Sequence, residues 1–411
     1  MSNETIETPD RRGSGAFKWD LAGADEIPMW VADMDFSVAP EITAALHERI
    51  DHPVFGYTGV PHSYRQALAH WESRRNGWEI DPNEMVVVPS VMPAMAVAVE
   101  ALTTPGDRVV TFSPVYFPFF ETVEALGRTL VRVPLVERTT TDGGTQYAMD
   151  YTALSEALQG AALFLFCSPH NPGGRVWTQG ELTTLHRTVA AAGVPVIADE
   201  IHSDLVFPGE QFVPWLMVGT ATERDMALVA PSKTFNIPGL PTATAIIPGE
   251  TWRDGYRRAL HAHMLRLPNL LALTAAEAAY RYGDRWLDTI QATIHQRYEL
   301  LRLELKAERG VQVRTMEGTF IAWIDLRERW GLPRNGAEQP VVAGGEGSDA
   351  AEPMSKQFGR LARKHGVWLS EGTQFGPEGE GFMRMNIATS ERNVKEGIAR
   401  FRGALEEFDG R

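Results

Sequence analysis

Short apolar runs recur between about residues 84 and 249, and longer amphipathic stretches separate them. The seven runs are EMVVV, DRVVTF, TLVRVPL, ALFLFC, VPVIAD, ALVA and TATAII. Uninterrupted apolar runs of this length are typical of strands whose two faces are both buried, as in parallel sheets. Strands that alternate with helices predict an α/β fold with a doubly wound, mostly parallel sheet of seven strands, which binds ligands at the strands' carboxyl ends.

The pattern changes in the second half of the chain. Apolar residues at helical spacing predict long helices between residues 252 and 309, in RRALHAHMLRL, LTAAEAAYRYG and DRWLDTIQATIHQRYELLRLELKAE. Three short strand-like runs follow, GTFIAWIDL, GVWLSEG and GFMRMNIA, and then an amphipathic helix near 391–408. We therefore expect a large domain over 48–290 and a smaller α+β domain formed by 1–47 and 291–411.

Between two of these late strands lies RNGAEQPVVAGGEGSDAAEP, which is rich in glycine, alanine and acidic residues. It has little apolar surface to bury, so we interpret residues 334–352 as a mobile insertion. An insertion at this point can reshape the entrance to a substrate site.

The composition, 44% hydrophobic and 22% charged over 411 residues, is that of a globular chain with sizeable cores. A formal net charge of −14 argues against nucleic acid or an anionic membrane as the main partner, because both require a basic surface. The amino terminus lacks the apolar core of a signal sequence and no apolar run is long enough to span a membrane, so we expect a cytoplasmic protein. The single cysteine, Cys167, excludes a disulfide framework, and we assign it no chemistry.

Polar residues stand where several of the predicted strands end. Ser90 precedes a helix that we expect to start at Val91, and the free amides of such a helix terminus bind phosphate. Tyr116 and Asn171 follow two other strands, and each also fits an ordinary role, a packed core tyrosine and a plain Asn-Pro-Gly turn. Asp199 ends the strand VPVIAD, where a buried carboxylate is costly unless it is paired.

Lys233 gives these residues a common explanation, although alone it reads equally well as a surface lysine that begins a loop. With its neighbours it matches pyridoxal 5′-phosphate (PLP), whose aldehyde forms a Schiff base with a lysine amine. Asp199 would keep the ring nitrogen protonated, Asn171 would bind the phenolic oxygen, and the helix after Ser90 would hold the phosphate. The protonated ring is the electron sink that lets an amino acid lose its α-proton.

The same residues carry a resemblance to a known family. Asn171-Pro172-Gly173, Asp199-Glu200 and Ser232-Lys233 resemble, in order and spacing, the class I/II aminotransferases of PLP fold type I. The subgroup they resemble is the MalY/PatB-type cystathionine β-lyases. Its motifs cover nearly the whole chain, as KWD (18–20), WVADMDF (30–36), GYTGVPHSY (56–64), SPHNPGGRVW (168–177), DEIHSDL (199–205) and PSKTFNIPGL (231–240).

The resemblance implies roles at the matching positions. Lys233 is then the Schiff-base lysine that also moves the α-proton, and Tyr116 contacts the ring. Tyr57, in the GYT motif, reaches the phosphate of the neighbouring subunit's cofactor, which implies a homodimer with shared active sites. Arg384, in FMRMN, pairs with the substrate α-carboxylate through a planar fork suited to bidentate recognition; its alternative is a surface arginine at a strand edge. His202 stands where many transaminases place a tyrosine on the phenolic oxygen.

Two positions depart from the wider superfamily. Many aminotransferases place an arginine eight residues after the lysine and a serine three before it, where this chain has Pro241 and Ala230. The lyase subgroup commonly lacks that arginine too, so the departure weakens a transaminase more than it weakens the cofactor. The phosphate ligands that remain are Ser232, Tyr57 and the amides of Val91 and Met92.

The resemblance implies a carbon–sulfur β-lyase that acts on L-cystathionine or another cysteine S-conjugate and releases a thiol, pyruvate and ammonia. Transamination is the first alternative, because it shares the initial proton transfer. A PLP-bound regulatory protein is the second, since a member of this family also restrains a transcription activator by direct contact.

Overall fold

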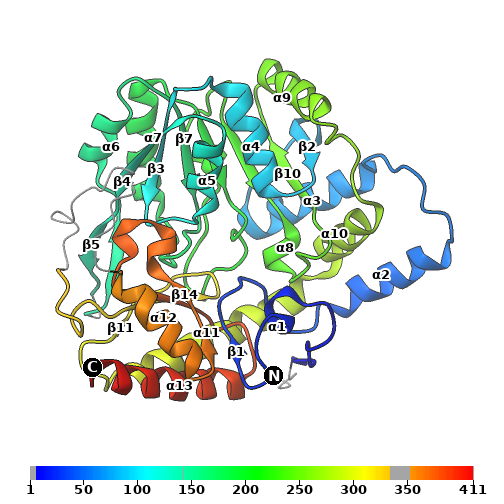
Figure 1. The fold of residues 1–411 in the computed structure, drawn as a ribbon. Helices are drawn as coiled ribbons and strands as arrows, with labels where there is room; N and C mark the ends of the chain where they lie inside the picture. The colour runs from blue at the N-terminus through cyan, green and yellow to red at the C-terminus, as the bar shows by residue number, and fades with distance from the viewer. Residues whose placement is uncertain (1–5, 142, 334–351, 411) are drawn as a thin grey trace.

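The computed structural model describes residues 6–141, 143–333 and 352–410, and all seven predicted strands form one sheet (Figure 1). The strand β10 runs antiparallel to both of its neighbours, and the other pairs are parallel, which confirms the mostly parallel sheet. In spatial order the strands are β2 (Met85–Val88), β10 (Ala243–Ile246), β9 (Met226–Val229), β8 (Val196–Asp199), β7 (Ala161–Cys167), β3 (Arg108–Ser113) and β4 (Thr129–Pro134).

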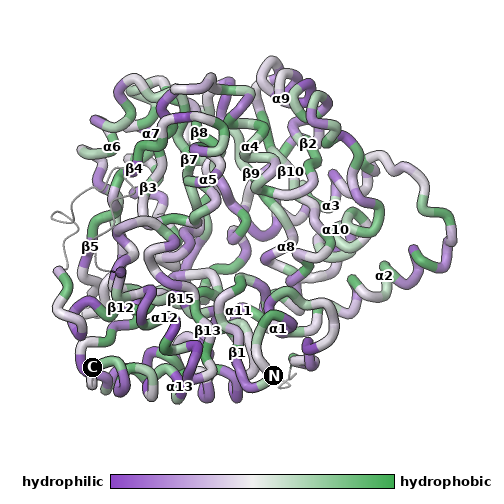
Figure 2. The backbone as a smooth tube through the Cα atoms, viewed as in Figure 1, coloured by the Kyte–Doolittle hydropathy of each residue, from purple (hydrophilic) through white to green (hydrophobic). Residues whose placement is uncertain are grey.

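Both faces of this sheet are buried, which explains why its strands are apolar without alternation. Along β7, Leu163 and Leu165 pack on one side with helices α4 (Val91–Leu102) and α9 (Glu250–Ala262). Phe164 and Phe166 pack on the other side with α6 (Tyr151–Ala157) and α7 (Gln179–Ala192). In Figure 2 hydrophobic residues predominate along the strands of the large sheet, whereas the outer helix α13 (Glu391–Asp409) has mixed colours.

Helices connect the strands and cover the sheet. The helix predicted from RRALHAHMLRL begins and ends earlier than that run, because Gly249 precedes a first turn at Glu250 and the helix stops at Ala262. The helices are α3 (His62–Asn76), α4 (Val91–Leu102), α5 (Pro118–Ala125), α6 (Tyr151–Ala157), α7 (Gln179–Ala192), α8 (Pro231–Thr234), α9 (Glu250–Ala262), α10 (Leu270–Tyr282) and α11 (Asp284–Leu305).

A second, four-stranded antiparallel sheet follows α11, with the order β11 (Gln312–Val313), β12 (Ile321–Asp325), β15 (Phe382–Asn386), β14 (Ser370–Glu371). Helices α12 (Met354–Lys364) and α13 (Glu391–Asp409) pack against each other and against this part of the chain. The run GVWLSEG, expected as one strand, is two. Its first half, β13 (Val367–Trp368), pairs with the amino-terminal β1 (Ile27–Pro28), and only the second half joins the sheet as β14.

The strands β5 (Val136–Thr139) and β6 (Thr145–Ala148) form a hairpin that the sequence pattern did not predict. A cluster of ion pairs connects this hairpin to the small sheet. Arg314, almost fully buried, pairs with Asp325 at 2.9 Å and with Glu137 of this hairpin at 2.5 Å. Arg327 pairs with the same two carboxylates. A buried arginine shared by two carboxylates holds the hairpin against the small sheet.

The helix α2 (Pro40–Asp51) and the extended residues 52–61 project from the body of the molecule (Figure 1). We call residues 50–57 the arm. Its apolar side chains are exposed, with Phe55 at 59% and Tyr57 at 96%. The stretch interpreted as a mobile insertion lies outside the described residues, apart from Glu352. Within the described ranges, no helix is long and apolar enough to cross a membrane.

Candidate active site

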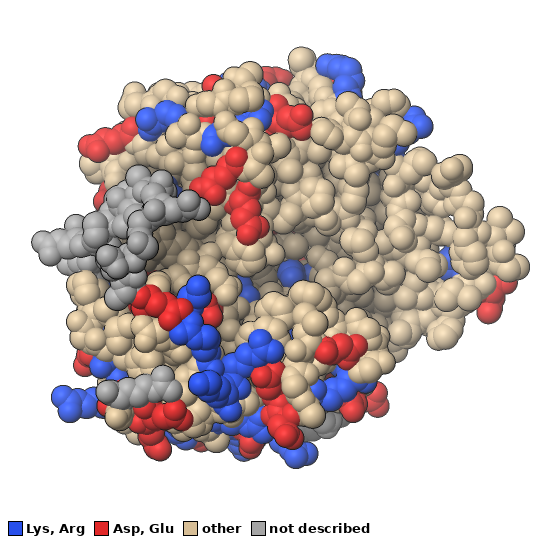
Figure 3. All heavy atoms as spheres, viewed as in Figure 1, with Lys and Arg blue, Asp and Glu red and all other residues tan. Residues whose placement is uncertain are grey.

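The predicted site residues lie where the strands of the large sheet end. Asp199 is the last residue of β8, Lys233 lies on α8 directly after β9, and Asn171 lies in the turn after β7. Figure 3 shows a hollow across this face of the molecule, between the large-sheet part and the part that carries α12, with Lys or Arg atoms at its floor. The topology therefore brings these side chains to one edge of the sheet, as expected for an α/β fold.

Lys233 is held by a backbone carbonyl from a distant part of the chain. Its Nζ donates to the carbonyl oxygen of Ala32 at 2.5 Å. Burial lowers the pKa of Lys233 to about 8; the charge of Arg384 also lowers it, while Asp33 and Asp199 oppose this change. An amine with a pKa near neutrality is suited both to attack an aldehyde and to carry a proton.

Asp199 is a buried carboxylate close to this amine. Its Oδ1 accepts a hydrogen bond from the backbone N–H of Ile201 at 3.1 Å. Burial raises the pKa of Asp199 to about 6, against the effect of that hydrogen bond and of Lys233. A carboxylate this buried needs a cationic partner, and a protonated ring nitrogen would supply one.

Arg384 reaches the site from the small sheet. It is 4% exposed, so it is not a surface arginine at a strand edge. One Nη donates to Asn171 Oδ1 at 3.2 Å, and the other donates to the carbonyl oxygen of Trp30 at 2.7 Å and to Ser370 Oγ at 3.2 Å. Burial lowers the pKa of Arg384 to about 10. Its guanidinium lies over the Phe375 ring, 4.6 Å from the centroid.

His202 and Tyr116 border the same group of charges. His202 is buried, and within the described chain its Nδ1 has no hydrogen-bond partner. Burial, with Lys233 and Arg384 nearby, lowers the pKa of His202 to about 3, so the ring is neutral. Burial raises the pKa of the Tyr116 phenol, with Arg384 opposing. Each presents a neutral polar group beside Lys233 and Arg384.

The start of α4 differs in one respect from the prediction. The helix begins at Val91 with Ser90 at the N-cap position, as expected, but among the described residues the Ser90 side chain makes no capping hydrogen bond. The amides of Val91 and Met92 lie in this uncapped first turn. Those amides and the hydroxyl are thus free to bind an anion.

These residues fit PLP. Among the described residues, Nδ1 of His202 has no hydrogen-bond partner, the first turn of α4 has no side-chain cap, and the buried carboxylate of Asp199 has no ion pair. The cofactor has groups that suit each of these three positions. Met92 and Ser232, both half-buried, lie in the first turns of α4 and α8. Tyr57 is the exception, because it lies on the exposed arm and the single chain does not bring it to Lys233.

The sequence motif WVADMDF contains the residues whose importance we did not predict. The segment 30–36 has no regular structure, and side chains from β15 and from the stretch on and after α8 bind its backbone. Asn386 Nδ2 donates to the carbonyls of Val31 and Asp33, each at 2.6 Å, and Asn236 Nδ2 donates to those of Met34 and Phe36 at 3.1 and 2.8 Å. The tryptophan-rich motif was the available signal, but a motif does not show which backbone atoms face a lysine.

His170 was also missed. It is buried, its Nε2 lies 2.9 Å from the carbonyl oxygen of Pro114, and its Nδ1 accepts the backbone N–H of Gly173 at 3.2 Å. These two bonds fix the tautomer with the proton on Nε2. A single ring therefore ties the turn that carries Asn171 to the turn that precedes Tyr116.

Three carboxylates are buried beneath α8. Asp204 accepts from Trp71 Nε1 at 3.0 Å and from Thr234, the residue after Lys233, at 2.9 Å. Burial and the neighbouring Asp204 raise the pKa of Glu72 to about 8. Burial also raises the pKa of Glu200 well above its usual value. Of the three, Asp204 contacts the one-turn helix that carries the lysine, through Thr234.

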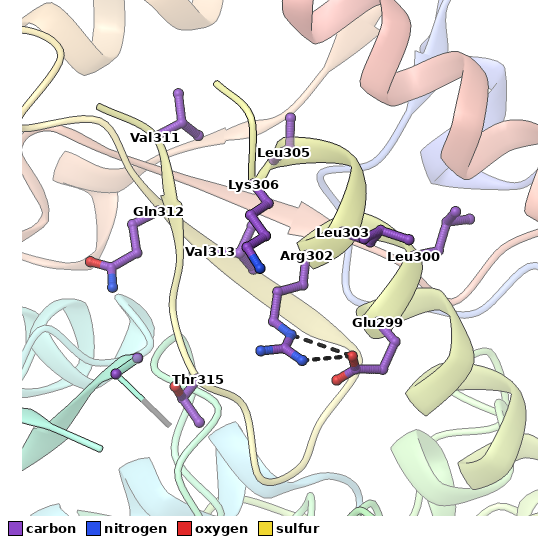
Figure 4. Close-up of a pocket in the computed structure, with 12 residues that line it drawn as sticks. Glu299, Leu300, Arg302, Leu303, Leu305, Lys306, Val311, Gln312, Val313 and Thr315 are labelled. Carbon is purple, nitrogen blue, oxygen red and sulfur yellow. Dashed lines mark hydrogen bonds and ion pairs between the residues drawn. The ribbon is translucent and has the colours of Figure 1, made fainter. Parts of the chain in front are cut away.

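A cavity of about 510 Å³ lies elsewhere, between the end of α11, β11 and the turn of the β5–β6 hairpin (Figure 4). Its lining includes Leu303, Val311 and Lys306, together with Arg302, which pairs with Glu299 at 2.9 Å. Of the described residues that line it, none belongs to the predicted site.

Comparisons with known proteins show what the whole chain is similar to. The family model for aminotransferase class I and II matches residues 25–401. Cystathionine beta-lyase PatB of Bacillus subtilis is 36% identical over 96% of this chain and 98% of its own length. The crystal structure of cystalysin from Treponema denticola, which contains pyridoxal 5′-phosphate, covers 99% of this chain and 100% of its own at 28% identity, with a TM-score of 0.88. The PLP-bound C-S lyase from Staphylococcus hominis covers 98% of both chains at 27% identity, with a TM-score of 0.85.

We predict that Glu72→Gln changes how stability depends on pH. The folded pKa of Glu72 is about 8 against an ordinary value of 4.5, so the folded state holds the extra proton between these two values. The contribution of protonated Glu72 to the free energy of unfolding is fully present below pH 4.5 and is lost as the pH rises through 8. Glutamine cannot ionise, so the variant should gain stability relative to the native chain across this window, at up to about 1.4 kcal/mol per pH unit.

Denaturant unfolding of both proteins at a series of pH values measures this difference. Comparison at pH 4.5 serves as the control, since both side chains are neutral there or nearly so. A difference that stays constant up to pH 8 would show that Glu72 ionises normally.

Proposed function

The chain belongs to the aminotransferase class I and II family, and from this premise we propose that it cleaves L-cystathionine or a related cysteine S-conjugate to a thiol, pyruvate and ammonia. It is a PLP-dependent carbon–sulfur β-lyase, as full-length similarity to cystathionine β-lyases and PLP-bound C-S lyases indicates. The observation that supports an α-amino acid as the substrate is the arrangement of Lys233 and Arg384. A proton-carrying amine and a buried carboxylate receptor stand together, as an α-amino acid requires.

PLP, when bound, supplies the electron sink that stabilises negative charge at the substrate Cα. We assign its binding to residues around the strand ends. Asp199 holds the ring nitrogen, Asn171 and His202 face the phenolic oxygen, and Tyr116 contacts the ring. Ser90, Ser232 and the amides of Val91 and Met92 hold the phosphate.

Lys233 anchors the cofactor and moves the proton at the substrate Cα. Its lowered pKa means that part of the amine is neutral near pH 8 and can act as a base. Its bond to the Ala32 carbonyl gives the amine a fixed position when it is not attached to the cofactor.

Arg384 binds the substrate carboxylate. Its guanidinium is already oriented by Asn171, Trp30 and Ser370, while its Nε is buried and, among the described residues, has no partner. A preoriented fork of this kind recognises a carboxylate at low entropic cost.

We also propose a homodimer in which the arm of one subunit completes the site of the other. Arg49 donates to the carbonyls of His52 and Val54, both at 2.8 Å, so the arm is shaped before any partner binds. Its exposed Val54, Phe55 and Tyr57 need cover, and a second copy would place Tyr57 at the partner's phosphate.

The cytoplasm is the proposed location, on the grounds of the sequence. We further propose the division into a cofactor-binding domain over 48–290 and a smaller domain formed by 1–47 and 291–411. The helix α11 crosses that boundary without interruption, so the two parts share one rigid element.

We predict that the PLP-loaded protein releases pyruvate and free thiol from L-cystathionine in equal amounts, over many turnovers and without any keto acid. Lys233→Ala should abolish both products and the visible absorption band of the bound cofactor. Lys306→Ala, which removes an exposed lysine at the separate cavity, is the matched control and should leave turnover unchanged. A keto-acid requirement would favour transamination instead, and full activity of Lys233→Ala would remove the lysine from the site.

We predict that Arg384→Ala raises KM for the amino acid by roughly 10- to 100-fold, with a smaller change in kcat, because a charge-assisted pair contributes about 1.5–3 kcal/mol. Arg384→Lys keeps the charge but loses the fork, so its KM should lie between those of the native and alanine enzymes. Steady-state kinetics at saturating PLP measures both. An unchanged KM in Arg384→Ala would exclude this arginine as the carboxylate receptor.

We predict that two inactive variants complement each other. When Lys233→Ala and a Tyr57 variant such as Tyr57→Ala are unfolded, mixed and refolded together, half of the dimers are hybrids with one intact site, so about a quarter of native activity should return. Lys233→Ala mixed with Arg384→Ala is the control. Both of those residues act within one subunit, so no activity should return beyond the residual activity of the Arg384→Ala subunits. Failure of the first pair to recover would place Tyr57 outside the partner's site.

A further inference from the structure

The segment 30–36 is bound to the site through nearly every one of its carbonyl groups. Arg384 binds the carbonyl of Trp30, and Asn386 binds those of Val31 and Asp33. Between them, the carbonyl of Ala32 accepts from Lys233 Nζ at 2.5 Å. The backbone that contacts the amine is therefore fixed on both sides, and the next residue along it is an aspartate.

The carboxylate of Asp33 is buried and only partly neutralised. Its side chain is 13% exposed, and its Oδ2 accepts from Arg11 at 2.7 Å. Its Oδ1 lies 3.5 Å from Lys18 Nζ and, within the described chain, accepts no hydrogen bond. A buried carboxylate oxygen without a hydrogen bond is costly, and this one belongs to the residue that directly follows Ala32, whose carbonyl binds Lys233.

Asp35, two residues further on, provides a contrast. It shares the same cations, with Arg11 at 2.9 Å and Lys18 at 3.0 Å, and its Oδ1 also accepts from Trp19 at 2.7 Å. Those three donors account for Asp35 as the structural anchor of the segment. Asp35 Oδ2, like Asp33 Oδ1, has no hydrogen-bond partner among the described residues. The two differ in position, because Asp33 directly follows the residue whose carbonyl holds the lysine.

Four ionisable groups face Lys233 from the elements around it. Arg384 comes from β15, Asp199 from the end of β8, His202 from the turn after β8, and Asp33 from the segment 30–36. His202 is neutral. Burial and Arg384 lower the pKa of the amine, and Asp33 opposes them more strongly than Asp199 does. If Asp199 is paired with the cofactor ring, as proposed above, Asp33 is the remaining counter-charge.

We propose that Asp33 is a positioning residue for Lys233, whose carboxylate sets the proton affinity of the Nζ and whose backbone presents the Ala32 carbonyl to it. The inference rests on the proposed lyase function for its purpose. The amine must take the proton from the Cα–H bond, whose electrons form the Cα–Cβ double bond as the C–S bond breaks. It then gives that proton to the departing thiolate. An amine can do both only if neither protonation state is strongly favoured.

The test is a pH titration of the visible absorption band of the PLP-loaded protein, which reports the proton on Lys233 Nζ without any turnover. Asp33→Asn and Asp33→Ser remove the charge, and each should move the midpoint to lower pH by about one unit. Asp33→Glu keeps the charge and should restore most of the native midpoint. Asp35→Asn disturbs the same segment and the same two cations, so it controls for a general loss of structure and should leave the midpoint in place.

A second measurement covers variants that bind the cofactor poorly. Acetylation of Lys233 by acetic anhydride in the cofactor-free protein, followed by peptide mass spectrometry over a range of pH, gives the midpoint of the free amine, which the loss of the Asp33 charge should move in the same direction. A native midpoint in Asp33→Asn or Asp33→Ser, or an equal shift in Asp35→Asn, would overturn the proposal. A shift confined to the Asp33 variants, in a protein that forms no pyruvate, would refute the lyase and leave the assignment of Asp33 intact.

Discussion

The structure depends on keeping one amine buried at the end of a parallel strand. Lys233 stands on a helix of a single turn, which cannot hold its own geometry, so other parts of the chain must fix it. Thr234 donates a hydrogen bond to Asp204, and the amine of Lys233 donates one to the Ala32 carbonyl. Removing a cation from water costs free energy unless charges and hydrogen bonds replace the solvent. The carboxylates of Asp33 and Asp199 supply that replacement.

Two sheets contribute to this arrangement, and neither suffices alone. The large sheet provides Lys233, Asp199 and the turn with Asn171, because the carboxyl ends of parallel strands meet at one edge. The small sheet provides Arg384, and the Arg384–Asn171 hydrogen bond joins the two. The segment 30–36 is bound by side chains of β15 in the small sheet and by Lys233 and Asn236, which follow β9 of the large sheet. A chain with a net charge of −14 thus concentrates cationic groups where an amino acid and a phosphate would bind.

Fold prediction from the sequence succeeded where local pattern and tertiary environment agree. All seven strands of the large sheet were found, because burial on both faces leaves an unmistakable apolar run. The prediction was wrong where strand boundaries depend on which strands pair with each other. The run 366–372 divides into two strands because its first half pairs with β1 and its second half pairs with β15. The β5–β6 hairpin was missed because it is polar on its exposed face. Ser90 stands at the N-cap position of α4, but among the described residues its side chain makes no capping hydrogen bond.

The sequence by itself determined the fold class, the cofactor and the residue types at the strand ends, because these follow from periodicity and from motifs contiguous in the chain. Only the tertiary structure decided that Arg384 is buried against Asn171, that His170 ties two turns together, and that the Ala32 carbonyl meets Lys233. These contacts join residues separated by 213, 56 and 201 positions. No local pattern encodes them, since a backbone carbonyl has the same chemistry in every residue and gains its role only from the place to which the fold brings it.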